Sequence, residues 1–315
     1  MSSTPRNRPL ALVGPTACGK TEASIPLARA LGAEIVSIDS MVVYRGMDVG
    51  TAKPTPAERA AVPHHLLDVV DPAEPFSVAE FGRLAVCAID DVRAGGALPL
   101  LVGGSGLYFR AVVDGLRFPA TEPETRGLLE AEASAIGPDA MYRRLAELDP
   151  VAAGRIEPSN VRRTVRALEV AGVTGRAFST FAADWERYPA EHVRAAGIEV
   201  PRAVLHERIE RRVSAMMPGL LAETARLVET GSGPRGFITS TQAIGYAEAL
   251  GCLEGRMSVD EAAARTTRRT KALARRQLAW FRRDPRIRWF PVGQVGAIGA
   301  LDGLIRYLGK EREGS

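Results

Sequence analysis

One eight-residue segment near the start of the chain constrains its fold more than any other. Residues 14–21 read GPTACGKT, with two glycines separated by four residues and followed by lysine and threonine. Glycines at this spacing let backbone N–H groups converge on phosphate oxygens, lysine supplies a positive charge, and the threonine hydroxyl can bind Mg²⁺. The segment predicts a loop that binds phosphate or pyrophosphate, with Thr21 as a Mg²⁺ ligand, formed by Gly14, Pro15, Thr16, Ala17, Cys18, Gly19, Lys20 and Thr21.

The residues around this loop predict a parallel β-sheet. Short apolar runs at Leu10–Val13, Glu34–Ile38 and Leu98–Val102 have the composition of buried strands, and residues 21–31 have helical spacing. A strand, a glycine loop, a helix and a second strand form a βαβ unit, which requires parallel strands. We therefore expect an α/β fold whose core resembles that of P-loop NTPases, a parallel sheet flanked by helices.

The character of the sequence changes near residue 119. Helical patterns separated by proline-containing breaks occupy residues 123–136, 139–148, 151–156, 160–172 and, later, 203–231. We expect an all-helical domain at 119–200, inserted into a core formed by residues 1–118 and 201–315. A strand over 197–204 is predicted to return the chain to the sheet.

Charge is distributed unevenly between the two halves of the chain. Residues 1–150 carry 14 Lys and Arg against 19 Asp and Glu, whereas residues 151–315 carry 27 against 18. Ten basic residues fall between Arg265 and Arg288, where Asp284 is the one acid, and eight of the ten lie on a helix predicted over 258–284. This density makes a polyanion such as nucleic acid a candidate partner, although basic runs also form solvated helix faces.

The composition restricts the compartment. No stretch approaches the roughly 20 apolar residues that span a bilayer, and the polar start followed by a short apolar run does not match a secretory signal. The three cysteines, Cys18, Cys87 and Cys252, include no C-x-x-C pair and predict neither a zinc site nor disulfides. We therefore expect a cytoplasmic protein.

Asp39 is the acidic residue best placed for chemistry at the phosphate loop. Most P-loop hydrolases and many kinases end another strand in an aspartate that helps hold Mg²⁺, but Leu98–Val102 is followed here by Gly-Gly-Ser. Asp39 instead follows the strand 34–38, at the sheet edge where open α/β folds bind ligands. Three roles remain open for it: the second shell of a metal, a general base, or a helix cap.

Eight blocks, in order along the chain, carry a more specific resemblance. They read GPTACGKT, SIDSMVVYRGMDVGTAKP, HHLLDVVDP, LLVGGSGLYFRA, DPVAAGRI, RRTVRALEV, QAIGY and ARRQLAWFR. With these blocks the chain resembles the tRNA dimethylallyltransferases, also called tRNA delta-2-isopentenylpyrophosphate transferases, over nearly its whole length.

The resemblance implies a reaction. Dimethylallyl pyrophosphate would place its pyrophosphate on the loop with Mg²⁺. The N6 amine of adenosine at tRNA position 37 would be alkylated, giving N6-isopentenyladenosine and pyrophosphate. By the matching blocks, Asp39 would accept the amine proton, Lys20 would stabilise the pyrophosphate, and Ser105 and Arg126 would lie near the reacting groups. Ser105 stands where threonine is common in the family.

The resemblance also implies a surface for the anticodon stem-loop of tRNA, and we expect the protein to be a monomer. Three positions depart from the family pattern: Val42 replaces a commonly polar residue, Val161 a frequent aspartate, and Ala247 a usual Lys or Arg. The matching tRNA-binding positions are Asp39, Ser40, Met41, Val42, Arg162, Arg163, Thr164, Val165, Arg166, Gln242, Gly245, Tyr246, Arg275, Arg276, Gln277, Trp280 and Arg282.

Three other functions are compatible with parts of the sequence. A small-molecule kinase using ATP would explain the loop, but it predicts an acid at the end of Leu98–Val102. An enzyme that prenylates free adenine nucleotides would share the loop and Asp39 but would not need the basic second half. A non-catalytic RNA-binding module would leave the loop and Asp39 without a purpose.

Overall fold

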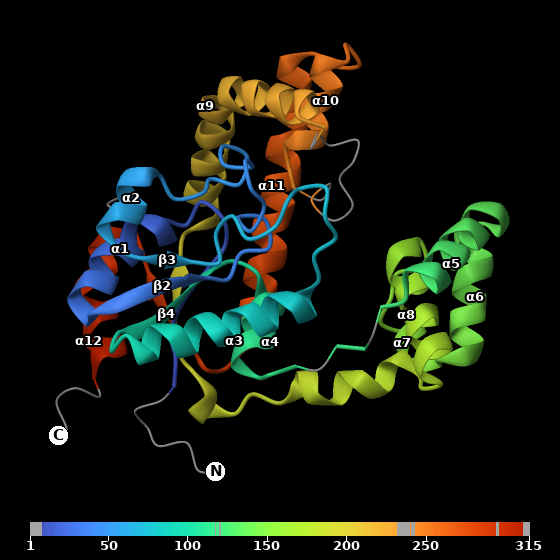
Figure 1. The fold of residues 1–315 in the computed structure, drawn as a ribbon, viewed down its shortest axis with the longest axis horizontal. Coiled ribbons are helices and arrows are strands. Elements are labelled where there is room, and N and C mark those ends of the chain that lie inside the picture. The colour runs from blue at the N-terminus through green and yellow to red at the C-terminus, as the bar shows by residue number, and fades with distance from the viewer. Residues whose placement is uncertain are drawn as a thin grey trace. The chain divides into compact units, whose positions relative to one another are not determined.

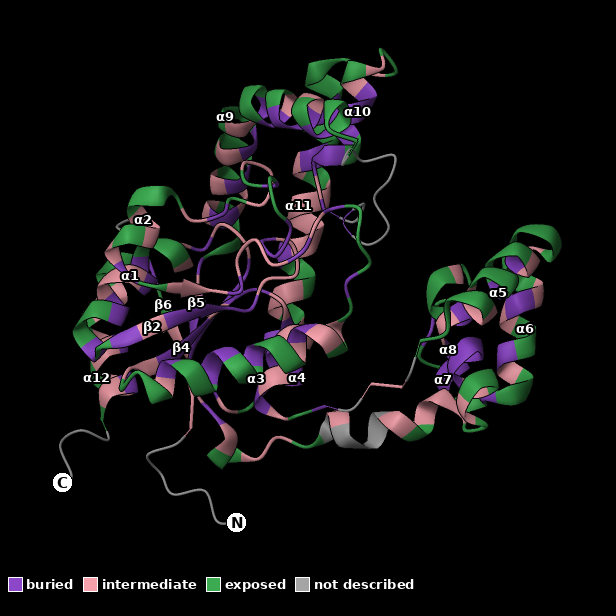
Figure 2. Cartoon of the chain, viewed as in Figure 1, coloured by how far each residue is buried: buried purple, intermediate pink, exposed green. Residues whose placement is uncertain are grey.

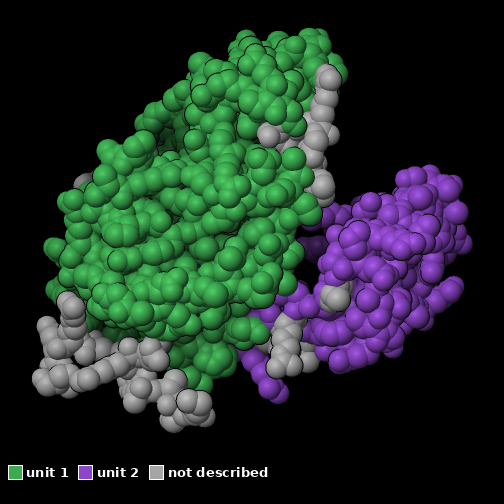
Figure 3. All heavy atoms as spheres, in the orientation of Figure 1, with its two compact units in different colours: residues 1–115, 189–315 green, residues 116–188 purple. Residues whose placement is uncertain are grey.

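The structure is a computed structural model that describes residues 8–116, 118–119, 121–231, 240, 243–293 and 296–310. It divides into two compact units. Unit 1 consists of residues 1–115 and 189–315, and unit 2 of residues 116–188 (Figure 3). Each unit has its own buried core (Figure 2).

Unit 1 is built on a six-stranded sheet in the order β3-β2-β4-β1-β5-β6 (Figure 1). Every neighbouring pair is parallel. The strands are β1 (Leu10–Val13), β2 (Ala33–Ser37), β3 (His64–His65), β4 (Leu98–Gly103), β5 (Arg194–Glu199) and β6 (Ile287–Pro291). The predicted α/β fold with a parallel sheet is confirmed.

Helices cover both faces of this sheet. Parallel crossovers are right-handed, and the β1–β2 and β3–β4 connections run in opposite directions across the sheet, so α1 and α3 lie on opposite faces. Helix α12 packs beside α1, and α4 packs beside α3. The helices of unit 1 are α1 (Lys20–Leu31), α2 (Pro56–Ala61), α3 (Val78–Ala94), α4 (Gly106–Val113), η3 (Ala190–His192), α9 (Arg202–Glu229), α10 (Tyr246–Leu253), α11 (Val259–Phe281), η5 (Ala297–Ala300) and α12 (Leu301–Gly309).

Local sequence signals account for several element ends. The Ser77 side chain accepts a hydrogen bond from the Glu80 amide and caps α3. Helix α1 ends at Gly32, whose left-handed backbone (φ 61°) suits glycine. Ser258 and Glu261 form a capping box at the start of the basic helix α11.

The predicted domain boundary differs from the structure at β5. This strand lies inside the predicted insertion and begins three residues before the predicted strand over 197–204. Its sequence, RAAGIE, is rich in Ala and Gly rather than β-branched residues, which hides the strand from a propensity argument. The strand is nevertheless paired on both sides, to β1 and β6, and unit 2 ends at Tyr188.

Unit 2 is an all-helical module. Its elements are α5 (Pro123–Ile136), α6 (Pro138–Leu148), α7 (Pro150–Ala153), α8 (Val161–Thr174) and η2 (Phe178–Glu186). Met141 and Leu145 of α6 are fully buried in its core with apolar residues of α5 and α8. The buried carboxylate of Asp149 caps α7 through the Ala152 amide and accepts a second bond from the Ser179 amide.

The two points where the chain leaves and re-enters unit 1 are joined by one arginine. The guanidinium of Arg286 donates to both carboxylate oxygens of Asp114, at 2.6 and 3.0 Å, and to the carbonyl oxygen of Pro189 at 3.3 Å. It is also bonded to Asp284. Arg110 pairs with the same Asp114 carboxylate. Asp114 and Arg286 are each less than 5% exposed, so this is a buried ionic cluster.

Over the described ranges, no helix combines the length and apolar character needed to cross a membrane.

Candidate active site

The phosphate loop lies between β1 and α1, with its glycines in conformations that favour glycine. Gly19 precedes α1 with φ 96°, a conformation that residues with a side chain rarely adopt. A Cβ at this position would lie 2.8 Å from Ala297 Cβ. The Lys20 ammonium folds over the loop and donates to the carbonyl oxygens of Gly14 (2.9 Å) and Pro15 (2.8 Å). The positive charge of Lys20 is therefore held next to the N-terminus of α1, where an anion is favoured.

Two cavities meet at this loop. A cavity of about 480 Å³ is lined by Thr16, Ala17, Gly19, Lys20 and Thr21 of the loop, and one of about 680 Å³ lies beside it under α11. Five residues line both cavities: Thr16, Asp39, Thr51, Arg212 and Gln277. An anion on the loop and a second ligand in the larger cavity would therefore meet at these side chains.

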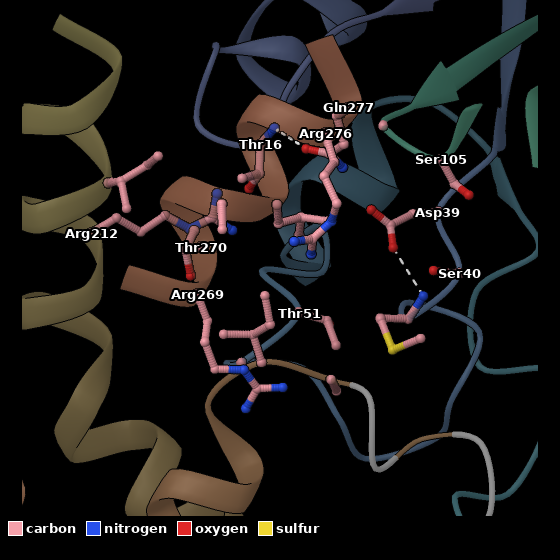
Figure 4. A pocket seen from close by; sticks show the side chains of 18 of the residues that line it. Thr16, Asp39, Ser40, Thr51, Ser105, Arg212, Arg269, Thr270, Arg276 and Gln277 are labelled. Carbon is pink, nitrogen blue, oxygen red and sulfur yellow. Dashed lines mark hydrogen bonds between the residues drawn. The ribbon is translucent and has the colours of Figure 1, made fainter. Parts of the chain in front are cut away.

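Asp39 and Ser105 stand at the carboxyl ends of neighbouring strands. Asp39 follows β2, and its carboxylate accepts a hydrogen bond from the Met41 amide at 2.9 Å, which fixes its orientation (Figure 4). Ser105 follows β4 and precedes α4, without capping that helix through its side chain. Both line the larger cavity. The backbone amide of Ser105 donates to Ile38 O at 3.3 Å, which ties the two turns together.

Helix α9 contributes a basic wall that the sequence analysis missed. Arg208, Arg211 and Arg212 line the smaller cavity, opposite the phosphate loop. Burial lowers the pKa of Arg212, and the negative charge of Asp39 opposes that shift. A guanidinium remains charged in either case. The spacing i, i+3, i+4 puts all three on one helix face, and that was the available signal.

Helix α11 closes the site from the other side. Gln277 accepts a hydrogen bond from the Thr16 amide at 2.8 Å, so this helix touches the phosphate loop directly (Figure 4). Trp280, one turn later, packs on the turn after β4, where a Cβ on Gly106 would lie 1.9 Å from Trp280 Cδ1. Gly104 likewise leaves room for Gln277. The glycines after β4 are thus needed for the close approach of α11.

The loop that carries Thr51 is held by two buried charges. Glu223 of α9 accepts hydrogen bonds from the Asp48 and Val49 amides at 2.9 Å, and from the Tyr246 hydroxyl at 2.5 Å. The ammonium of Lys53 contacts Asp48, Asp68 and the Tyr44 carbonyl oxygen. Although burial opposes ionisation, hydrogen bonds from Lys53 and Arg59 lower the pKa of Asp68.

The residues at the loop suit Mg²⁺ bound together with a pyrophosphate. Mg²⁺ prefers oxygen ligands and is commonly held by a few protein oxygens plus substrate phosphates and water. Thr21 and Asp39 both line the smaller cavity and offer such oxygens. Within the part of the chain that the structure describes, no group of three or more His, Cys, Asp or Glu could hold a metal alone. His64 and His65 bond separately, to Val62 and Glu34.

Comparison with known proteins identifies the family. The family model described as "IPP transferase" matches residues 42–284, and the one described as "Isopentenyl transferase" matches residues 8–68. The chain belongs to the IPP transferase family. It is 49% identical to the tRNA dimethylallyltransferase of Streptomyces coelicolor over 93% of each chain. It is 50% identical to that of Kineococcus radiotolerans, over 90% of this chain and 91% of the relative.

Solved structures of IPP transferases have the same fold. The full-length tRNA isopentenylpyrophosphate transferase of Bacillus halodurans is 38% identical, with a TM-score of 0.66 over 98% of this chain and 99% of that one. A eukaryotic dimethylallyltransferase acting on tRNA is 25% identical, with a TM-score of 0.71 over 98% of this chain and 77% of that one. The resemblance drawn from the sequence blocks is confirmed.

The predicted tRNA-binding residues of this IPP transferase differ in how far they are exposed to solvent. Arg162, Arg163, Arg275, Arg276 and Arg282 are exposed, and Ser40, Met41, Arg166, Gln277 and Trp280 are partly exposed. By contrast, Val42, Thr164, Val165, Gly245 and Tyr246 are buried. Gln242 lies outside the described residues.

Tyr246 is the clearest departure from the predicted contacts. Its side chain is fully buried, and its hydroxyl donates to Glu223. Burial and the negative charge of Glu223 raise its pKa. In this structure Tyr246 therefore supports the Thr51 loop from within the core, and a contact with tRNA stays a prediction. Thr164 and Val165 are likewise core residues of α8.

Arg126 is engaged within unit 2. Its guanidinium contacts the Glu169 carboxylate at 2.7 Å, and Arg166 contacts the same carboxylate at 2.9 Å. Although burial opposes ionisation, the hydrogen bonds from Arg166 and Arg126 lower the pKa of Glu169. A role for Arg126 near the reacting groups stays a prediction.

Proposed function

We propose that this protein transfers the dimethylallyl group of dimethylallyl pyrophosphate to N6 of adenosine 37 in tRNA. It is a prenyl-group transferase of the IPP transferase family, and its relatives carry the name tRNA dimethylallyltransferase. The readings as an ATP-dependent kinase or as a prenyltransferase of free nucleotides find no support among these relatives.

The observation that carries the proposal is the junction of the two cavities. Asp39 and Thr16 line both, so a pyrophosphate on the loop and a base in the larger cavity would have their reacting atoms on either side of the same residues. The larger cavity, about 680 Å³, has the volume for an unstacked base and a five-carbon chain.

Departure of the pyrophosphate is favoured by fixed positive charge. Lys20, the loop amides and the arginines of α9 surround the position of the anion. Mg²⁺, held by Thr21 and the pyrophosphate oxygens, would neutralise further charge on the leaving group. The allylic C–O bond breaks with its electron pair going to pyrophosphate, because an allyl carbon tolerates partial positive charge.

Proton removal from the acceptor falls to Asp39. The exocyclic amine of adenine is conjugated with the ring and is a weak nucleophile, so a base must take its proton as the N–C bond forms. An ordinary aspartate is ionised at neutral pH, and the Met41 amide holds this one in place. We further propose that the exposed arginines of α11 bind the tRNA backbone, and that the enzyme acts as a cytoplasmic monomer.

The test measures transfer of labelled dimethylallyl to unmodified tRNA with adenosines at positions 36 and 37, in Mg²⁺ without ATP. Free AMP serves as the parallel acceptor. Label is expected in the tRNA alone. Asp39→Ala should lower kcat by about 10²- to 10⁴-fold while tRNA affinity changes little. Asp90→Ala, at an exposed acid on α3, is the matched control. Label in AMP alone, or near-normal turnover by Asp39→Ala, would contradict the proposal.

A further inference from the structure

Helix α11 carries exposed arginines and also lines the larger cavity, and Arg276 does both. Arg275 and Arg276 are exposed, whereas Gln277 is partly buried and reaches the phosphate loop. Thr270, Leu273, Gln277 and Trp280 follow helical spacing and line the larger cavity. One helix therefore carries both the basic groups offered to RNA and a polar side chain placed on the donor loop.

The atom that Gln277 contacts is one that an anion would use. Backbone N–H groups of a phosphate loop are its anion-binding donors. The side-chain oxygen of Gln277 accepts from the Thr16 N–H at 2.8 Å, so in this structure that donor is already satisfied from within the protein. A pyrophosphate oxygen that takes this N–H has to displace Gln277.

The contact is geometrically confined. A Cβ on Gly104 would lie 2.5 Å from Gln277 Nε2, so the side-chain amide is wedged between the phosphate loop and the turn after β4. Trp280 rests on Gly106 in that same turn, next to Ser105. A shift of α11 by about one ångström is enough to break a bond of this length, because a donor–acceptor distance near 3.5 Å no longer makes a proper hydrogen bond.

We propose that Gln277 is a positioning residue that couples acceptor binding on α11 to donor binding on the phosphate loop. Without RNA, Gln277 holds the Thr16 N–H and weakens binding of pyrophosphate. RNA bound to the arginines of α11 draws Gln277 from the loop and frees this donor. By linkage the effect is reciprocal, so pyrophosphate strengthens RNA binding by the same factor. This inference rests on the proposed function, because it takes tRNA and a pyrophosphate as the two ligands.

The test is titration calorimetry of the full chain with inorganic pyrophosphate and Mg²⁺, with and without an unmodified anticodon stem-loop RNA. For wild type, we expect the RNA to tighten pyrophosphate binding by about 5- to 50-fold, the usual range of coupling between sites. Gln277→Ala should bind pyrophosphate alone about 2- to 10-fold tighter, which is the worth of one hydrogen bond. RNA should then change that affinity by less than about 2-fold.

Three further variants separate coupling from general damage. Gln277→Asn is too short to reach Thr16 and should behave like Gln277→Ala. Gln277→Glu keeps the length but places a carboxylate beside the anion, and should weaken pyrophosphate binding by at least about 10-fold. Ala279→Gln puts a glutamine at an exposed position of α11 and should leave pyrophosphate binding unchanged. Thermal unfolding of each variant checks that the fold is retained.

The outcomes distinguish this inference from the proposed function. If wild type binds both ligands and Gln277→Ala keeps the wild-type coupling, or binds pyrophosphate no more tightly, the coupling role is wrong and the proposed function stands. If wild type fails to bind pyrophosphate at all, both are wrong.

Discussion

Replacing Glu223 should destabilise unit 1 by removing the anchor of the Thr51 loop. The carboxylate is 2% exposed and accepts bonds from the Asp48, Val49 and Gly50 amides and the Tyr246 hydroxyl. Each buried donor left without an acceptor costs about 1–3 kcal/mol. Because water can reach part of the loop in the variant, the costs will not add in full. We expect Glu223→Ala to lower the free energy of unfolding by about 3–5 kcal/mol.

Two milder variants grade the effect. Tyr246→Phe removes one donor to a charged acceptor and should cost about 1.5–3 kcal/mol. Glu223→Gln preserves the volume but replaces one acceptor oxygen by an NH₂ group, which faces donors, and should cost an intermediate amount. Since Thr51 lines both cavities, the same order is expected for the loss of pyrophosphate affinity.

The assay can be confined to unit 1. The chain has three tryptophans, and Trp185 is the one in unit 2, where it packs against Phe118. In a Trp185→Phe background, fluorescence during urea unfolding at pH 7 reports only Trp280 and Trp289, both in unit 1. A Glu223→Ala variant within about 1 kcal/mol of its parent would refute the reasoning, because four lost hydrogen bonds to a buried carboxylate cannot cost so little.

Two further predictions concern packing and acid. Gly106→Ala should destabilise unit 1 by about 1–3 kcal/mol and reduce transfer, because its Cβ would overlap Trp280. Gly82→Ala on α3 is the control and should be neutral or stabilising, because a Cβ there would lie 4.0 Å from the Cβ of Ala111. Equal effects of the two variants would exclude the steric explanation. Burial opposes ionisation of Asp114, but Arg286 and Arg110 lower its pKa below the usual value. The contribution of the Asp114 carboxylate to the free energy of unfolding is therefore complete above the pKa of about 4 in the unfolded chain, and it is lost as pH falls through the pKa in the folded protein. The stability difference between wild type and Asp114→Asn, measured by urea unfolding from pH 7 to pH 3, should therefore shrink only below about pH 4, and a difference that is already lost at pH 6 would contradict this assignment.

Local signals made much of the fold predictable. The phosphate loop, the first strands and the position of Asp39 after β2 each depend on residues within one element or its ends. Such features follow from backbone geometry and short-range hydrogen bonds, which a sequence pattern records directly. The start of strand β5 was not predicted, because its pairing with β1 and β6 makes it a strand and its small side chains do not indicate one.

Several residues of the site were predictable from the sequence, but the contacts between them were not. The bond between Thr16 and Gln277 joins positions 261 residues apart, and no pattern in either segment indicates it. Glu223 and Tyr246 illustrate the same limit, since a glutamate and a tyrosine are ordinarily surface or interface residues. Their mutual burial under the Thr51 loop follows from the tertiary fold. The shared helix face of the α9 arginines could have been predicted from their spacing.

The shared attachment to Arg286 has a consequence for how this chain can be cut and rejoined. Asp114 and Pro189 both bond to one guanidinium nitrogen, so the ends of the 116–188 segment emerge side by side from the core. A few residues are enough to bridge that gap. Unit 2 can thus be treated as a removable cassette: a shortened chain with a small glycine-rich loop in its place should still fold into the six-stranded core, and the same junction would accept a foreign domain whose own termini lie close together.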